Sequence, residues 1–332
     1  MKNNLLYLLL LLSTHAFAQS PKEKGLNSIN KESAEAYITF LAHDLLEGRE
    51  AGKRGSRIAA EYIKSVLQGI GIKPYPETYY QSFEAYSKER QKRTRFYVHP
   101  DTIAKYREED AHRKLELKNV LGYIEGKNKN ECVIIGAHYD HLGIDESLAN
   151  DKIYNGADDN ASGVSAVLQI AKAFLMSGEK PEHSIIFAFW DGEELGLLGS
   201  EYFMLSYNSS VKIKGYLNFD MIGRNNNETK PKQVVYFYTE AHPAFGEWLK
   251  DDIICYDIQL EPDYKPWDKP IGGSDNASFA KRDIPVIWYH TDGHPDYHQP
   301  GDHVEKINWE KLVSITKAAY LNLWNLANLD KY

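Results

Sequence analysis

Short apolar runs alternate with longer amphipathic stretches from residue 119 to the end of the chain. Strands that alternate with helices form a mostly parallel sheet with helices on both faces. We therefore expect an α/β fold with a mostly parallel, mixed central sheet in a single domain. The predicted strands span residues 119–124, 133–137, 184–190, 216–219, 234–238 and 286–289, and the predicted helices span residues 161–176, 195–205, 245–253 and 309–327.

The pattern is weaker upstream of residue 119. Apolar spacing predicts a helix that starts near Ser33. A glycine-rich loop then leads into a second helix, which we expect to stop at Gly69. Residues 83–118 are polar and weakly patterned, so they form either an edge hairpin or a surface excursion. We divide the domain into N-terminal helices with this excursion at residues 19–118 and an α/β core at residues 119–332.

The first 18 residues have the composition of a secretory signal peptide. Lys2 supplies a positive charge, residues 5–12 are apolar, and Ala16-Phe17-Ala18 forms a cleavage signal. The apolar run is too short to cross a bilayer comfortably, although a membrane anchor is the alternative. We expect an exported protein, periplasmic or secreted, that starts at Gln19 and has no membrane span after cleavage. The sequence leaves its oligomeric state open.

Net charge and cysteine content narrow the choice of partners. The formal net charge of −8 argues against nucleic acid. Two cysteines, Cys132 and Cys255, are too few for a disulfide framework or a thiolate zinc site. Both lie among apolar residues, so we interpret them as small buried hydrophobic side chains, with one disulfide bridge as the alternative.

Residue types that bind metals follow the predicted strands. His138 and Asp140 stand two apart at the end of one strand, so extended backbone places them on the same side. This arrangement suits a metal-bound imidazole that a carboxylate orients, although a surface turn could also contain these residues. Asp159 precedes a predicted helix, where negative charge is favoured, and could equally cap that helix.

Two adjacent carboxylates, Glu193 and Glu194, follow an apolar predicted strand. Adjacent carboxylates repel unless a cation or a proton lies between them. Neighbouring side chains diverge, so one can bind a metal while the other acts as the general base that hydrolysis requires. A solvated helix N-terminus is the alternative.

Asp220 at the end of another strand and His298 within Asp-Tyr-His complete the set. Nitrogen and oxygen donors without thiolate suit zinc, with manganese or cobalt as substitutes. Five ligands exceed what one tetrahedral catalytic site can use. They suit two metals that share a carboxylate and lie roughly 3.5–4 Å apart.

The motifs GAHYDHLG, GADDNASG, WDGEELGLLGS, NFDMIG and YHQPGD, in this order, resemble the M28 family of di-zinc aminopeptidases. The resemblance implies that Glu193 is the catalytic glutamate and that Asp140 supports His138. It also implies a cis peptide bond after Asp159. The implied ligands are His138 and Asp220 at one zinc ion, Glu194 and His298 at the other, and Asp159 bridging the two.

The substrate pocket departs from the family pattern. Residues 273–279 match a stretch that usually reads Ser-Asp-His, but this chain has Asn276 at the third position. The resemblance assigns the pocket to four residues: Asp275, Asn276, Phe279 and Tyr297.

The expected function is therefore that of an exported metallo-aminopeptidase acting on peptides with a free N-terminus. A glutaminyl cyclase of the same fold with one zinc ion is an alternative. A carboxypeptidase or deacylase is another, but its lid would need roughly a hundred residues that the segment between Asp220 and His298 does not supply. A binding protein on the same scaffold would have lost ligands or the base, and this chain retains them all.

Overall fold

The computed structural model of the chain describes residues 19–88, 95–108, 112–267 and 271–332. The predicted signal peptide lies outside the described residues. Among the helices that the described residues form, none combines the length and apolar character needed to cross a bilayer.

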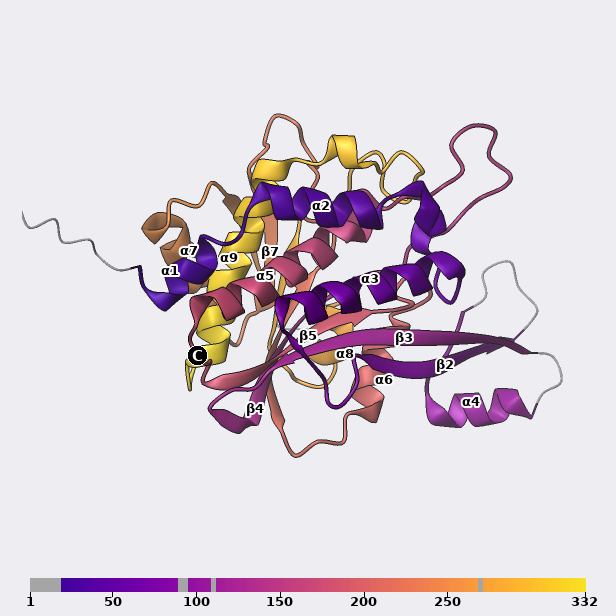
Figure 1. The fold of residues 1–332 in the computed structure, drawn as a ribbon, viewed down its shortest axis with the longest axis horizontal. Coiled ribbons are helices and arrows are strands. Elements are labelled where there is room, and N and C mark those ends of the chain that lie inside the picture. The colour runs from indigo at the N-terminus through magenta and orange to yellow at the C-terminus, as the bar shows by residue number, and fades with distance from the viewer. Residues whose placement is uncertain (1–18, 89–94, 109–111, 268–270) are drawn as a thin grey trace, which may run out of the picture.

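A mixed sheet forms the centre of the molecule (Figure 1). Parallel pairing joins four strands in its middle, in the order β5 (His183–Trp190), β4 (Asn128–His138), β6 (Lys212–Phe219) and β9 (Val286–His290). Antiparallel pairs extend both sides of this centre. On one side β3 (His112–Ile124) pairs with β5 and carries β1 (Lys73–Pro74) and β2 (Tyr80–Lys88), and on the other β7 (Gln233–Thr239) pairs with β9 and carries β8 (Glu261–Trp267).

Helices cover both faces of this sheet, which confirms the predicted α/β class (Figure 1). One face packs against α1 (Pro21–Leu26), α2 (Lys31–Leu41), α3 (Arg54–Ile70), α5 (Gly163–Ser177), α7 (Ala244–Cys255) and α9 (Trp309–Asn328). The other face packs against α6 (Leu198–Ser206) and α8 (Asn276–Ala280), while α4 (Pro100–Arg107) lies beside β2. Short helical turns complete the description: η1 (Asp44–Arg49), η2 (Ala157–Ser162) and η3 (Val304–Lys306).

Alternation along the central strands builds a separate core on each face. In β4, Val133 and Ile135 face the α5 side, whereas Ile134 between them faces the α6 side. Every residue of β5 is buried, as expected for a strand covered on both faces. The central strands are therefore covered on both faces up to the edge where the parallel strands end.

The predicted strands and helices of the α/β core are present, with shifted ends. The helix predicted from residue 195 begins at Leu198, because Gly196 and Leu197 take positive φ values of 115° and 61° in the preceding turn. The helix predicted to stop at Gly69 continues to Ile70, and Gly71 ends it with a φ of 91°. Glycine adopts this left-handed conformation without steric cost, so Gly71 is the better stop signal.

Other differences lie at the sheet edges. Residues 83–118 contain parts of β2 and β3, whose antiparallel pairing confirms the edge hairpin, together with α4. No strand was predicted at the position of β8, which contains Pro262 and Pro266. Proline cannot donate to a ladder, so this edge strand escapes a propensity-based prediction.

The prediction that both cysteines are buried is correct for one of them and wrong for the other. Cys132 is buried as predicted, but Cys255 is exposed at the end of α7, and both thiols are free. An apolar neighbourhood in sequence does not ensure burial in a surface helix, because only one face of such a helix packs against the core.

Candidate metal centre

The predicted ligands meet where the parallel strands end. His138 is the last residue of β4, and Asp220 directly follows the last residue of β6. Glu193 and Glu194 follow β5 after a short turn, and His298 lies in the loop after β9. The carboxyl edge of the sheet therefore gathers side chains that are far apart in sequence, as is usual for ligand sites of α/β proteins.

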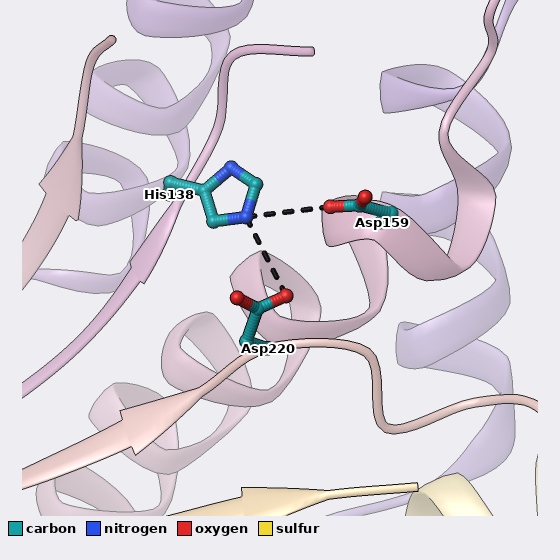
Figure 2. A group of neighbouring side chains, drawn as sticks. All are labelled: His138, Asp159 and Asp220. Carbon is teal, nitrogen blue, oxygen red and sulfur yellow. Dashed lines mark ion pairs between the residues drawn. The ribbon is translucent and has the colours of Figure 1, made fainter. Parts of the chain in front are cut away.

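His138, Asp159 and Asp220 form the first group. The Nε2 atom of His138 lies 3.3 Å from Oδ1 of Asp159 and 3.6 Å from Oδ1 of Asp220. Figure 2 shows the two carboxylates converging on the same ring nitrogen from different elements. All three residues are buried and their donor atoms lie within 4.8 Å of one another, which is close enough to share one metal ion.

The second group uses the other oxygen of Asp159. The Nε2 atom of His298 lies 3.3 Å from Oδ2 of Asp159 and 3.2 Å from Oε2 of Glu194. The two oxygens of Asp159 therefore face different histidines. A carboxylate in this position can bridge two metal ions.

Asp159 occupies this position because of the local backbone. It lies in η2, just before α5, and the peptide bond between Asp159 and Asn160 is cis, as the resemblance predicted. The side chain of Asn160 donates to the carbonyl oxygen of Phe219 at 2.9 Å, which ties this turn to the end of β6. The segment that carries Asp220 is thereby held next to the segment that carries Asp159.

Asp140 contacts both His138 and the turn that carries the paired glutamates. Its carboxylate forms an ion pair with Nδ1 of His138 at 3.8 Å, and its backbone carbonyl oxygen lies 3.2 Å from the same nitrogen. The carboxylate also accepts hydrogen bonds from the backbone N–H groups of Glu193 at 3.0 Å and Glu194 at 3.3 Å. Asp140 thus fixes the turn that carries the paired glutamates.

A third histidine, His141, reaches the site although no role was predicted for it. Its Nδ1 atom lies 2.7 Å from Oε1 of Glu194 and 3.8 Å from Oδ2 of Asp159. Glu194 therefore lies between His141 at one oxygen and His298 at the other. The available signal was the position of His141 directly after Asp140, but adjacent residues of an extended segment point to opposite sides and this argued against a shared site.

A cavity of about 180 Å³ opens above the two groups. Tyr297 lies on its wall, as predicted, and its side chain is partly exposed. Asp275, Asn276 and Phe279 do not line it, because they are buried behind the wall on the α8 side. The side chain of Asn276 donates to the carbonyl of Ile271 at 2.6 Å and so holds the segment before α8. The wall also contains Met221, Gly273, Trp288, His290 and Gly293.

The clustered carboxylates of the site favour the binding of cations. Burial raises the pKa of Glu193 well above its usual value, and the positive charge of a protonated His138 offsets this only in part. Burial opposes protonation of His138, but Glu193, Asp159 and Asp220 outweigh it and raise the pKa of His138. Carboxylates this close together are stable only with protons or metal ions between them. The nitrogen and oxygen donors fit zinc.

Comparison with known proteins identifies relatives. The sequence profile of "Peptidase family M28" matches residues 119–322. The chain is 29% identical over 282 residues to leupeptin-inactivating enzyme 1 of Streptomyces exfoliatus, covering 83% of this chain and 52% of that protein. It is 34% identical over 116 residues to an aminopeptidase of Pseudomonas aeruginosa, covering 34% of this chain and 20% of the relative. The chain thus spans about half or less of the length of these curated relatives.

Solved structures share the fold. The LapA aminopeptidase of Legionella pneumophila superposes with a TM-score of 0.69 at 23% identity, covering 93% of this chain and 75% of that one. A glutaminyl cyclase of Fimbriiglobus ruber superposes with a TM-score of 0.65 at 15% identity, covering 89% and 95% of the two chains. At these identities the likeness concerns the fold, which both types of enzyme have in common.

Proposed function

The chain belongs to peptidase family M28, and we propose that it is an exported aminopeptidase with a dinuclear zinc centre and Glu193 as general base. One observation carries the proposal: the two oxygens of Asp159 face different histidines, His138 and His298, at 3.3 Å each. A single metal ion would not need this arrangement, whereas two ions that share a carboxylate would.

Each ion would have its own ligands besides the shared one. His138 and Asp220 would hold the first ion. Glu194 and His298, whose Oε2 and Nε2 atoms lie 3.2 Å apart, would hold the second. Bound zinc supplies a Lewis acid for the scissile carbonyl group and lowers the pKa of water toward neutrality. His141 contacts the oxygen of Glu194 that faces away from His298, and so fixes how Glu194 presents its other oxygen.

Glu193 is the residue available for proton transfer. It lines the cavity beside His138 and Asp220, and Asp140 fixes its backbone. In the proposed reaction Glu193 takes a proton from the water whose oxygen attacks the carbonyl carbon. It returns that proton to the nitrogen as the C–N bond breaks, so the products are an amino acid and a peptide shortened by one residue.

The cavity of about 180 Å³ is the space that we assign to the N-terminal residue of the substrate. Trp288 and Met221 give the wall an apolar part, and His290 gives it a polar one. An N-terminal residue would therefore enter with its side chain, while the rest of the peptide extends outward.

The test is a panel of aminoacyl anilides, including one with an acetylated amino group, together with one X-Pro dipeptide. We expect hydrolysis of free aminoacyl anilides, no hydrolysis of the acetylated one, and loss of activity with a chelator. Restoration should require two equivalents of zinc. Equal turnover of the acetylated and free substrates would overturn the assignment as an aminopeptidase and favour a deacylase or an endopeptidase.

Glutaminyl cyclase activity is the second candidate, because a cyclase shares this fold with a TM-score of 0.65. A peptide with N-terminal glutamine distinguishes the two. A cyclase would release ammonia and leave a pyroglutamyl peptide, whereas an aminopeptidase would release free glutamine. Saturation at one zinc equivalent, together with ammonia release, would replace the proposed function by this one.

A further inference from the structure

Arg49 is a buried cation that the proposed reaction does not use. It ends η1, and only 1% of its surface is exposed. Burial lowers the pKa of Arg49 to about 10, so the guanidinium keeps its charge at neutral pH. It donates hydrogen bonds to backbone carbonyl oxygens, which belong to Leu41 and Asn155 at 2.6 Å each, Tyr139 at 2.8 Å, Gly156 at 2.9 Å and Asp159 at 3.4 Å.

Four of these five carbonyl groups belong to the segments that carry His138 and Asp159, and the fifth, that of Leu41, ends α2. Tyr139 stands between His138 and Asp140, and Gly156 begins the turn that contains Asp159. The backbone of Arg49 adds to this, because its carbonyl oxygen accepts from the N–H of His141 at 3.1 Å. Arg49 therefore joins the end of β4 to the turn before α5, across 90 and 110 positions of sequence.

Asp302 binds the same turn from its other side. It is 1% exposed, and its Oδ2 atom accepts from the backbone N–H of Asp158 at 2.9 Å and of Asp159 at 3.0 Å. Its backbone carbonyl oxygen accepts from the N–H of Ala157 at 3.0 Å. Asp302 lies four positions after His298, so it connects the turn to the segment of the second metal group.

A buried cation thus binds the carbonyl groups of Gly156 and Asp159, and a buried carboxylate binds the N–H groups of Asp158 and Asp159. Arg49 and Asp302 do not form an ion pair with each other. Among the described residues, Arg49 has no carboxylate within 4.0 Å, whereas Asp302 has Nη1 of Arg224 at 3.9 Å from its Oδ1 atom. Hydrogen bonds with one ionised partner are shorter and stronger than neutral ones, so the turn is fixed firmly. A backbone held from both sides leaves the Asp159 side chain little freedom.

We propose that Arg49 and Asp302 are positioning residues that clamp residues 156–159 and thereby fix the Asp159 carboxylate between His138 and His298. The proposal rests on the proposed dinuclear centre, because it explains how the bridging ligand is held in place. Residues that orient metal ligands typically change metal affinity or activity about 10–100-fold when they are replaced.

The first experiment compares zinc affinity in Arg49→Gln and Asp302→Asn with that of the wild type, using a chromophoric chelator as competitor. Glutamine cannot reach carbonyl groups on both segments, and asparagine places an amide N–H₂ group against a backbone N–H. We expect both variants to bind zinc about 10–100-fold more weakly than the wild type, and the double variant to lose less than the product of the two. Zinc affinity within about twofold of wild type in either single variant would overturn the proposal.

Matched controls separate positioning from general stability. Arg282→Gln removes a guanidinium that binds Glu201 and the carbonyl of Ser278, outside the ligand segments. Asp252→Asn changes a buried carboxylate on α7 that accepts from Asn322. Both controls should lower the thermal unfolding midpoint while leaving zinc affinity unchanged. Equal losses of zinc affinity in the controls and in the clamp variants would refute a positioning role.

A second measurement does not depend on metal. Hydrogen–deuterium exchange of the metal-free protein should show slow exchange in the peptide that contains Asp158 and Asp159, and faster exchange there in Asp302→Asn and Arg49→Gln. Unchanged exchange would overturn the clamp even if the wild type bound no zinc. If wild-type protein binds fewer than two zinc ions but this peptide loses protection, the clamp stands and the dinuclear centre falls.

Arg49→Lys covers the case in which Arg49→Gln does not fold. Lysine keeps the charge but lacks the planar fork that reaches carbonyl groups on both segments. We expect zinc affinity between that of the wild type and that of Asp302→Asn. Wild-type zinc affinity and wild-type exchange in Arg49→Lys would show that the fork does not position the turn.

Discussion

Replacing Glu193 by glutamine should lower turnover by about 10²–10⁴-fold while leaving the metal centre intact. The two side chains have nearly the same shape, and in the described part of the chain no hydrogen bond to the Glu193 carboxylate is lost. A positioned general base contributes about 10²–10⁴-fold to rate, which equals about 2.7–5.4 kcal/mol of transition-state stabilisation. We expect kcat to fall by this factor, with zinc content unchanged and KM within about twofold.

Replacing Glu194 by glutamine should have the opposite signature. Its oxygens lie 2.7 Å from Nδ1 of His141 and 3.2 Å from Nε2 of His298. Glutamine offers one neutral oxygen in place of two anionic ones, so the second metal group loses a negative charge that would attract a metal ion. We expect the protein to retain one tightly bound zinc ion, with activity lost as a consequence.

The assay measures kcat and KM with a free aminoacyl anilide, and zinc per chain by elemental analysis after dialysis. Glu201→Gln serves as a control, because this carboxylate on α6 pairs with Arg282 and lies outside the centre. A Glu193→Gln enzyme that kept more than about a tenth of wild-type kcat would refute the base assignment. Two tightly held zinc ions in Glu194→Gln would refute the ligand assignment.

Other outcomes follow from the same geometry. Asp140→Asn should lower kcat/KM by about 10–100-fold in steady-state assays, because the carboxylate fixes the turn that carries the base. In metal-free protein, burial lowers the pKa of His298, but the contacts with Asp159 and Glu194 outweigh it and raise this pKa to about 10. Protonated His298 should therefore stabilise the folded state below pH 6.5, and this contribution to the free energy of unfolding should disappear as the pH rises toward 10. Urea unfolding across that range should show this loss, and His298→Gln should remove it. A maleimide should label Cys255 but not Cys132 in the folded protein, as mass spectrometry would show. Mass spectrometry of the mature protein should show an N-terminus at Gln19, as the proposed export requires.

Local patterns were enough to predict where the candidate ligand side chains would meet. An apolar run marks a central strand, and its last residue lies at the carboxyl edge of the sheet. The proximity of His138 and Asp220 could therefore be predicted from their positions at the ends of two strands. Edge strands such as β8 could not be predicted, because their prolines and charged residues are not the residue types that indicate a strand.

Direction of side chains was harder to predict than position. Extended geometry placed Asp140 on the same side as His138 but did not reveal that its carboxylate accepts from the N–H groups of the next ligand segment. The chain leaves regular strand geometry at His138, so His141 also reaches Glu194. Continued alternation along a strand would have placed His141 on the side opposite His138. Alternation applies only while the backbone is extended, and the functional residues lie just beyond that limit.

The clamp illustrates a different limit. The matched family profile, residues 119–322, includes every predicted ligand and Asp302, but Arg49 precedes it. A buried arginine that binds carbonyl groups leaves no periodic signature, because its partners are backbone atoms that every sequence possesses. The N-terminal segment therefore contributes to the metal centre through a single side chain as well as through the helices that cover the sheet. Ligand types and spacing identify such a centre, whereas the residues that hold its geometry become visible only when hydrogen bonds to the backbone are traced in three dimensions.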